Sequence, residues 1–267
     1  MPTPAPCLTA TDRLALLLVR GVTVRFGGST ALDGISFEVQ PGTIAGLIGP
    51  NGAGKTTLFN CLSRLYTFSE GSILFEGQPL QQFSPHRIAA VGIGRTFENL
   101  ALFRSMSVRD NVMLGGHCRT GSGFLSNALR LPNVRREEAR LAEQADAMIA
   151  LLDLADVAQR PVADLPFGTQ KRVEFARALM SRPKLLLLDE PAGGLNHEEV
   201  DTLRQLLRRI QRELQLTILL VEHHMILVMR VSDQVVALDF GRKIADGTPA
   251  EVQAHPEVVR AYLGAEQ

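Results

Sequence analysis

The chain has 267 residues, and its 28 lysines and arginines are balanced by 28 aspartates and glutamates. This balance argues against a broad basic surface, so we expect no nucleic-acid partner. The length allows one large domain or one domain with a subdomain, and no apolar run is long enough to span a bilayer. Three scattered cysteines, Cys7, Cys61 and Cys118, show no disulfide or metal spacing, which fits a reducing cytoplasm.

The first predicted elements are short strands. Residues 1–12 are rich in Pro, Thr and Ala, and we expect a flexible N-terminus there. The apolar run that follows lacks a cleavage site of small residues, which favours a strand over a signal peptide. Because glycine-containing turns separate the next apolar runs, the sequence predicts strands over Leu16–Val19, Val22–Phe26 and Ile35–Val39.

A glycine-rich segment follows the apolar run Ile44–Ile48 and precedes Leu58, Leu62 and Leu65, which recur at helical spacing. It contains the pattern G-x-x-x-x-G-K-[ST], whose required context is a strand, a glycine turn and a helix. We expect its backbone N–H groups and the helix N-terminus to bind a polyphosphate. The residues predicted to bind nucleotide are Gly49, Pro50, Asn51, Gly52, Ala53, Gly54, Lys55, Thr56 and Thr57.

Two side chains of this phosphate loop, Gly49–Thr57, have predicted roles. Lys55 reaches the outer phosphates, and the Thr56 hydroxyl is a ligand for Mg²⁺. The alternative is an ordinary glycine turn before a core helix. All four defining residues and both flanks are present, which favours the phosphate site.

The middle of the chain differs in character from both ends. After a predicted strand at Ser72–Phe75, residues 107–164 contain no strand-like run, and Arg135–Leu154 has the spacing of an amphipathic helix. We therefore predict a helical subdomain inserted into an α/β core. The elements expected afterwards are helix Val173–Met180, strand Leu185–Leu188, a helix through Val200–Leu214, strands Thr217–Val221 and Val235–Leu238, and helix Pro256–Leu263.

Two acidic residues, Asp189 and Glu190, directly follow the strand Leu185–Leu188. Open α/β sheets bind ligands at the carboxyl ends of their strands. We therefore predict that Asp189 lies beside Mg²⁺ and that Glu190 accepts a proton from the attacking water. The alternative is a strand that ends in solvated acids, which the phosphate loop in the same chain disfavours.

The order of these motifs resembles the ATP-binding cassette (ABC) ATPases over roughly Leu16–Gly264. The resemblance implies that Phe26 stacks on adenine and that His223 is the switch histidine, although a lone Phe or His is more often a core or surface residue. Further segments stand in the family's positions: the Q-loop, Arg95-Thr96-Phe97-Glu98; the signature, Leu165-Pro166-Phe167-Gly168-Thr169-Gln170; and the D-loop, Gly194-Leu195-Asn196.

A narrower resemblance is to one ATPase subunit of bacterial importers for branched-chain and other hydrophobic amino acids. It rests on GIGRTFENLALF, LPFGTQKRVEFARALM, DEPAGGLN, LLVEHHMILVM, and DGTPAEV followed by PEVVRAYLG. That group also lacks the first Ser and Gly of LSGGQ, where this chain has Pro166 and Phe167, and it shares the D-loop residue Asn196. The PEVVRAYLG tail is the most particular of these segments.

The fold implied by the resemblance is an α/β, P-loop NTPase-like ABC ATPase core with a parallel sheet, an N-terminal antiparallel β subdomain and an inserted α-helical subdomain. We expect a single ABC ATPase domain over residues 13–267. Its RecA-like core with the antiparallel β part takes about 13–106 and 165–250, the helical subdomain about 107–164, and the C-terminal helix 251–264.

The function implied is ATP hydrolysis with Mg²⁺ in a bacterial importer, at the cytoplasmic face of the inner membrane. Glu190, His223 and Glu98 are the expected catalytic residues, and Thr56, Asp189 and Glu98 the expected Mg²⁺ ligands. The signature of a second ATPase subunit, a paralogue or a second copy, closes the nucleotide site. Glu98 departs from the family's usual Gln and adds a negative charge, which we hypothesise slows turnover or alters metal preference.

The other expected partners are two transmembrane permease subunits and, indirectly, a solute-binding protein. We expect the permease contact near Glu98–Asn111. Three alternatives stay open: the same role with another cargo such as urea, an amide, an aromatic acid or a lipid; a soluble ABC ATPase acting on nucleic acid or ribosomes; and a small-molecule kinase. The single cassette without a basic patch disfavours the second, and the signature-like segment with His223 disfavours the third.

Overall fold

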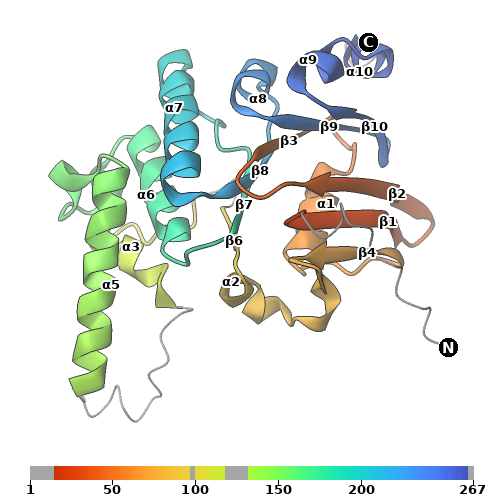
Figure 1. Cartoon of the computed structure of the whole chain (residues 1–267). Helices are drawn as coiled ribbons and strands as arrows, with labels where there is room; N and C mark the ends of the chain where they lie inside the picture. Colours follow the sequence, from red (N-terminus) through yellow and green to blue (C-terminus); the bar gives the residue numbers. More distant parts are fainter. Residues whose placement is uncertain (1–14, 97–99, 118–131, 264–267) are drawn as a thin grey trace. The chain divides into compact units, whose positions relative to one another are not determined.

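The computed structural model describes residues 15–96, 100–117 and 132–263 (Figure 1). The predicted flexible N-terminus over residues 1–12, Cys7, Glu98 and Cys118 lie outside the described residues. The chain divides into two compact units. The first unit comprises residues 1–85 and 215–267, and the second comprises residues 86–214.

An antiparallel sheet forms the N-terminal part of the first unit, as predicted. Its strand order is β2-β1-β4-β5, with bounds β1 Leu17–Phe26, β2 Ser29–Val39, β4 Glu70–Phe75 and β5 Gln78–Pro79. The sequence analysis was wrong to end a strand before Gly21, because β1 runs through it. Gly21 has a φ of +57°, and the pairing with β2 shifts between Val19 and Val22, so a bulge absorbs the glycine without interrupting the strand.

A second set of strands in the first unit has the order β10-β9-β3-β8. The bounds are β3 Ile44–Ile48, β8 Thr217–Val221, β9 Gln234–Asp239 and β10 Arg242–Gly247. β3 is parallel to both β8 and β9, and every residue of β3 and β8 is buried. This burial explains why both strands are continuous apolar runs rather than alternating ones.

The helices of the first unit are α1 Lys55–Leu62, α8 Met225–Val231, α9 Pro249–Gln253 and α10 Pro256–Leu263, with a 3₁₀ turn at Leu80–Gln82. α1 packs against β2, while α8 packs on β3 and α9 on β9 (Figure 1). α9 begins with a reciprocal cap, in which Thr248 accepts from the Glu251 N–H and the Glu251 carboxylate accepts from the Thr248 N–H.

The second unit contains a pair of parallel strands and its helices. The bounds are β6 Ile93–Arg95, β7 Leu185–Asp189, α2 Ile88–Val91, α3 Val108–Leu114, α5 Pro132–Leu151, α6 Phe167–Leu179 and α7 His197–Leu214, with 3₁₀ turns at Pro85–Arg87, Ala155–Val157 and Val162–Asp164. β6 pairs with β7 in the register Ile93 with Leu185 and Arg95 with Leu187. All five residues of β7 are buried.

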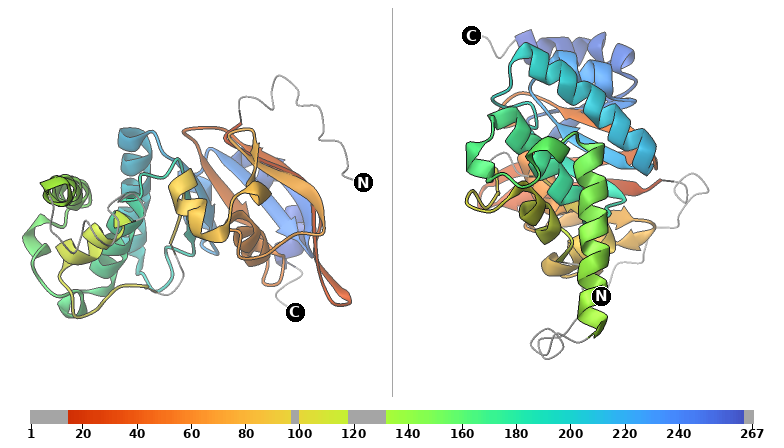
Figure 2. Two further views of the ribbon diagram at one scale, coloured as in Figure 1. Left: turned by 90° about the horizontal axis from the view of Figure 1, so that it is seen from below. Right: turned by 90° about the vertical axis from the view of Figure 1, so that its left-hand side faces the viewer.

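The predicted helical block is present in the second unit. The long helix α5 lies beside α3 and α6 (Figure 2), and its apolar stripe buries Ala145 and Ile149. The subdomain boundaries 107–164 remain a prediction. Among the described residues, no helix combines the length and the apolar character needed to cross a membrane.

Candidate functional site

The phosphate loop joins β3 to α1 in the first unit, as the motif predicted. Gly54 precedes α1 with a φ of +100°, and a Cβ at this position would lie 2.6 Å from Leu32 Cδ2 and 2.8 Å from the Ala31 oxygen. Only glycine fits this conformation and this space without strain. Among the described residues, no side chain caps the start of α1. A helix N-terminus is a favourable position for an anion.

Lys55 lies folded back over the loop. Its ammonium donates to the Gly49 oxygen at 2.6 Å and to the Pro50 oxygen at 3.0 Å, and the residue is only 6% exposed. The Thr56 side chain is exposed, as are Asn51 and Gly52. The loop therefore presents backbone N–H groups, a cation and a hydroxyl, which are the groups that bind a Mg²⁺-nucleotide.

Two elements from the C-terminal part of the chain support the loop. The Gly241 N–H, in the turn between β9 and β10, donates to the Ala53 oxygen at 3.1 Å. The backbone N–H of Gly49 donates to the hydroxyl of Tyr262 on α10, and burial raises the pKa of Tyr262 while this hydrogen bond opposes the rise. Sequence reasoning missed Tyr262, because more than two hundred positions separate it from the loop.

A surface cavity of about 680 Å³ lies between these elements. It is lined by Pro50, Asn51, Ala53, Asp239, Phe240, Arg242, Lys243, Ile244, Glu257, Arg260 and Ala261. Two of its cations are held by carboxylates, since Arg242 pairs with Asp33 and Lys243 with Asp246. Its lining therefore combines the outer side of the phosphate loop with α10.

Phe26 lies at the end of β1 with 49% of its surface exposed. Tyr66 packs edge-on against it, with ring centroids 5.3 Å apart. An exposed ring held by a second ring can stack on a flat base. The predicted adenine contact is compatible with this geometry and remains a prediction; Tyr66 was not identified from the sequence.

His223 follows β8 and is exposed. β8 and β3 are parallel neighbours with Leu47 opposite Val221, so His223 and the phosphate loop both leave the sheet at its carboxyl edge. The buried Glu222 accepts hydrogen bonds from the backbone N–H groups of His223 and His224, at 3.0 and 3.2 Å. Glu222 thus fixes the turn that carries the histidine, a role that the sequence analysis did not anticipate.

Asp189 and Glu190 end β7 in the second unit, as predicted. Asp189 is buried, and its Oδ2 accepts from an Arg95 Nη2–H at 2.8 Å. Glu190 is half-buried and adopts a left-handed φ of +48°. Its backbone oxygen accepts from the Gly193 N–H at 3.0 Å. A non-glycine residue in this conformation is strained, and such strain clusters at functional sites.

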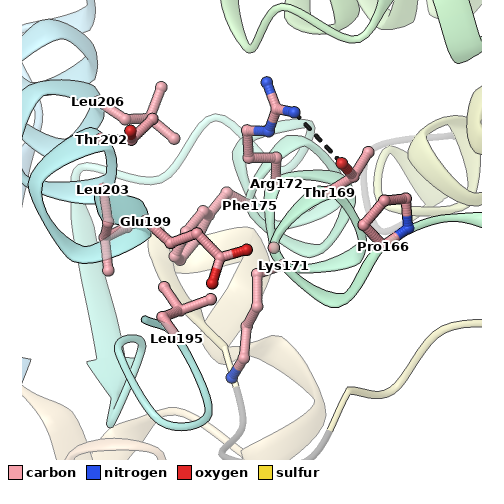
Figure 3. A pocket seen from close by; sticks show the side chains of 11 residues that line it. Pro166, Thr169, Lys171, Arg172, Phe175, Leu195, Glu199, Thr202, Leu203 and Leu206 are labelled. Carbon is pink, nitrogen blue, oxygen red and sulfur yellow. Dashed lines mark hydrogen bonds between the residues drawn. The ribbon is translucent and has the colours of Figure 1, made fainter. Parts of the chain in front are cut away.

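The signature segment, Leu165–Gln170, forms the entry to α6 (Figure 3). Gln170 turns back so that its amide donates to the Leu165 oxygen at 2.8 Å, and Arg172 donates to the Thr169 hydroxyl at 3.3 Å. Phe167 is 44% exposed, and the Lys171 ammonium lies 5.6 Å from its ring centroid. The start of α6 therefore carries an exposed ring beside a cation.

The structure brings the D-loop, Gly194–Asn196, next to the signature segment. A Cβ on Gly194 would lie 3.0 Å from the Phe167 ring, and one on Gly168 would lie 2.8 Å from Glu199 Oε1. Asn196 and Glu199 form a reciprocal cap at the start of α7, with hydrogen bonds of 3.0 and 2.9 Å. A cavity of about 170 Å³ between α6 and α7 completes this cluster (Figure 3).

The predicted site residues are thus distributed over both units. The phosphate loop, Phe26 and His223 belong to the first, whereas Asp189, Glu190, the signature segment and the D-loop belong to the second. Among the described residues, no group of three or more His, Cys, Asp and Glu side chains forms a ready metal site. The Thr56 hydroxyl in the first unit and the Asp189 carboxylate in the second are each oxygen donors of the kind that Mg²⁺ prefers.

Comparison with known proteins identifies the family. A model described as "ABC transporter" matches residues 32–193, which include the phosphate loop, the signature segment and Glu190. The chain belongs to the ABC transporter family. It is therefore an ATP-binding ABC ATPase, and a second model described as "Branched-chain amino acid ATP-binding cassette transporter" matches residues 242–267, which contain β10, α9 and α10.

Curated relatives cover nearly the whole ABC ATPase. It is 41% identical over 249 residues to the "High-affinity branched-chain amino acid transport ATP-binding protein BraF" of Pseudomonas aeruginosa, covering 93% of this chain and 98% of the relative. It is 40% identical, with the same coverage, to the protein LivG of the same description from Escherichia coli K12. A "Methionine import ATP-binding protein MetN" of Rhizobium etli is 36% identical over 98% of this chain and 68% of its own length.

Solved structures confirm the fold of this ABC ATPase. The ADP conformation of MJ1267, an ATP-binding cassette of an ABC transporter, superposes with a TM-score of 0.81 at 29% identity, covering 94% of this chain and 99% of that one. CbiO1 from Clostridium perfringens gives a TM-score of 0.79 at 31% identity, with 92% and 93% coverage. The predicted α/β ABC ATPase fold is therefore confirmed.

Proposed function

We propose that this chain is the ATP-hydrolysing subunit of a bacterial importer for branched-chain or related hydrophobic amino acids. The observation that carries the proposal is the match of residues 242–267 to a model for that transporter type, together with 41% identity to BraF over 93% of the chain. Relatives with another cargo, such as MetN, align at lower identity. The ATPase role itself rests on the complete phosphate loop.

The proposed chemistry uses Mg²⁺ as cofactor. Thr56, Asp189 and Glu98 are the residues that would hold it. Bound there, Mg²⁺ neutralises phosphate charge that develops during transfer. The chain's own contribution is the oxygen donor set of Thr56 and Asp189, which suits a hard cation.

Hydrolysis proceeds from ATP and water to ADP and phosphate. Glu190 accepts the proton of the attacking water. A turn closed by the Gly193 N–H on the Glu190 backbone oxygen holds this residue directly after β7. Lys55 leaves the loop carbonyls that it binds here and contacts the outer phosphates. His223, held by the turn around Glu222, acts at the γ-phosphate as the switch histidine, and Glu98 is the third proposed catalytic residue.

One subunit supplies half of a complete site. We propose that the signature segment of a second ABC ATPase subunit closes the nucleotide site, with Gly168 permitting backbone approach and the start of α6 facing the γ-phosphate. Pro166 replaces the usual signature Ser, so backbone N–H groups take over part of its role. ATP then holds two subunits together, and hydrolysis releases them.

An importer ATPase acts with membrane permease subunits. We propose two of them, a peripheral position at the cytoplasmic face of the inner membrane, and an indirect link to a solute-binding protein. The second ATPase subunit is a paralogue in the cell, and a homodimer is the alternative in vitro. The proposed permease contact is the region from Glu98 to Asn111, of which the described part leads into α3.

Uptake assays with identified partners test the proposal. The affinity-tagged chain is isolated from membranes of its own organism, co-purifying permeases are identified, and the complex is placed in vesicles with the adjacent binding protein. We expect ATP-dependent uptake of radiolabelled leucine, isoleucine or valine. Uptake of urea, amides, aromatic acids or lipid in their place would overturn the cargo, and the absence of any permease would overturn the transport role.

A further inference from the structure

An ion pair joins the predicted Mg²⁺ ligand Asp189 to Arg95. The Arg95 Nη2 lies 2.8 Å from Asp189 Oδ2, and both side chains are only 11% exposed. Arg95 was noted in the sequence only as the first residue of the Q-loop segment. Its pairing with a proposed Mg²⁺ ligand makes Arg95 a candidate for a role of its own at that site, which the charges of the pair define.

The strand register explains the pairing. Arg95 is opposite Leu187 in the parallel pair of β6 and β7, and the Thr96 N–H donates to the Leu187 oxygen at 3.0 Å. Side chains alternate along a strand, so Leu187 and Asp189 lie on the same face. The guanidinium therefore needs to reach only along that face to meet the carboxylate, and the register holds the two groups together.

The ion pair also offsets the cost of burying the Asp189 carboxylate. An ionised group as buried as Asp189 is costly without a partner, and a guanidinium hydrogen bond supplies one. The same contact occupies Oδ2 and places a positive charge beside the carboxylate, which opposes the approach of a cation. A carboxylate in this state is a poor metal site by itself.

We propose that Arg95 is a positioning residue that holds the Asp189 carboxylate and weakens its binding of Mg²⁺, so that the metal binds only when nucleotide phosphates supply further negative charge. The inference rests on the proposed function, because it takes Asp189 as a metal ligand.

A metal-binding experiment without nucleotide tests this inference. Mn²⁺ serves as the probe, and its free concentration is followed by electron paramagnetic resonance during titration of the full-length chain. We expect Arg95→Gln to bind Mn²⁺ about tenfold more tightly than the wild type, because one repelling charge is removed from the site. We expect Arg95→Lys, which restores the charge, to bind within about twofold of the wild type.

A second substitution locates the effect. In Arg95→Gln combined with Asp189→Asn, the gain in Mn²⁺ affinity is expected to disappear, since the released carboxylate is absent. If the gain persists in the double variant, or if Arg95→Gln alone binds Mn²⁺ no more tightly than the wild type, the inference is wrong. A residue that only tied β6 to β7 would change stability and leave these affinities unmoved.

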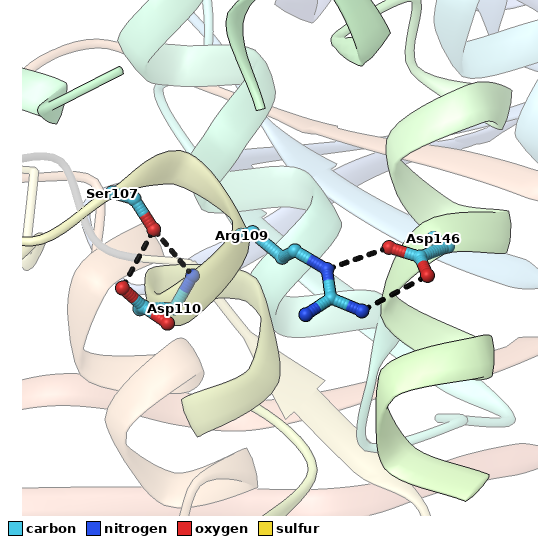
Figure 4. Close-up of polar contacts among 4 residues, drawn as sticks. All are labelled: Ser107, Arg109, Asp110 and Asp146. Carbon is cyan, nitrogen blue, oxygen red and sulfur yellow. Dashed lines mark hydrogen bonds and ion pairs between the residues drawn. The ribbon is translucent and has the colours of Figure 1, made fainter. Parts of the chain in front are cut away.

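Arg109 provides a matched control in the same unit. It donates to both oxygens of Asp146 at 2.8 and 3.0 Å on an exposed surface, so Arg109→Gln also removes one cation and releases one carboxylate (Figure 4). We expect no change in Mn²⁺ affinity from this variant. A gain equal to that of Arg95→Gln would show a non-specific charge effect and would refute the role of Arg95.

A measurement on the wild type covers the case in which Arg95→Gln does not fold. The side-chain signal of Arg95 in ¹⁵N-arginine-labelled protein, assigned from Arg95→Lys, is expected to shift with Mg²⁺ and a non-hydrolysable ATP analogue together but not with Mg²⁺ alone. A shift with millimolar Mg²⁺ alone would contradict the inference. A wild type that binds no Mg²⁺-nucleotide would instead refute the proposed function, so the two failures are distinguishable.

Discussion

The phosphate loop differs in construction from the carboxylate corner, by which we mean Arg95, Asp189 and Glu190. The loop is one continuous segment with glycines at positive φ, and its proposed phosphate contacts are mainly backbone N–H groups. The corner depends on side chains from separate segments, since Arg95 and Asp189 are 94 positions apart in the chain. A site made by main-chain groups can therefore be predicted from a single sequence motif, whereas a site made by paired side chains can be identified only once the strand register is known.

The signature segment falls between these extremes. Its position at the start of α6 follows from local sequence, but its neighbours Leu195 and Glu199 come from the D-loop and from α7. Substitutions in the loop, in the corner and in the signature should therefore impair different steps. These steps are nucleotide binding, hydrolysis, and completion of the site by a second subunit.

The largest expected effect comes from the carboxylate corner. Glu190→Gln removes the proposed proton acceptor, so we expect ATP hydrolysis to fall by about 10²–10⁴-fold while nucleotide binding is retained. Steady-state phosphate release and equilibrium binding of a fluorescent ATP analogue measure the two quantities. Hydrolysis at near wild-type rates would remove Glu190 from the mechanism.

A smaller loss is expected at the signature. Gly168→Ala places a methyl group 2.8 Å from Glu199 Oε1, so the Glu199 carboxylate must shift and its cap on the Asn196 N–H is weakened. The fold should tolerate this cost, because the contact is with the end of a side chain and not with backbone. The added group blocks close backbone approach to a partner's γ-phosphate, and we expect hydrolysis by the assembled complex to fall about a hundredfold. Nucleotide binding by the isolated subunit serves as the control, and its loss would show that Gly168 acts within its own chain.

Tyr262→Phe tests the support of the phosphate loop by α10. Removing the hydroxyl leaves the Gly49 N–H without this acceptor, so we expect a stability loss of about 0.5–1.5 kcal/mol and nucleotide affinity a few-fold weaker. Urea unfolding and analogue binding check both. An unchanged affinity would confine α10 to a structural role.

The smallest effect is expected far from the nucleotide site. The Arg109 hydrogen bonds hold the pKa of Asp146 below its ordinary value, so the pair stabilises the protein above that value and the contribution is lost as the pH falls below about 4. Solvent screens this exposed pair, and Asp146→Asn should cost about 0.5 kcal/mol at pH 7. Urea unfolding at pH 7 and pH 3 measures the difference, which is expected to be smaller at pH 3; a constant difference would refute this assignment.

Much of the fold was predictable because its central strands are buried on both faces. The continuous apolar runs of β3, β7 and β8 and the helical spacing in α5 and α7 were all identified. The two- and three-residue strands β5 and β6 were not, because so few residues carry no periodicity. β10 was missed because its charged residues mask its pairing with β9.

The candidate site was predictable to the extent that it is local. The motif at Gly49–Thr57 and the acids at Asp189–Glu190 were located correctly at the ends of β3 and β7. Their supports could not be found, for two reasons. Tyr262 is far from Gly49 in the chain, and a contact between distant positions leaves no spacing signal. Glu222 adjoins His223, but a lone acid after a strand does not indicate that its carboxylate accepts from the next backbone N–H groups. The catalytic roles of His223 and Glu98 remain predictions.

The most direct test of the central claim uses Lys55→Ala in the complex with its permease and ATPase partners. If the phosphate loop binds the nucleotide and a second subunit completes the site, the wild-type complex is expected to hydrolyse Mg²⁺-ATP. The variant is then expected to lose nucleotide binding by this subunit and at least about a hundredfold in hydrolysis. Equal binding and hydrolysis by variant and wild type would contradict the account.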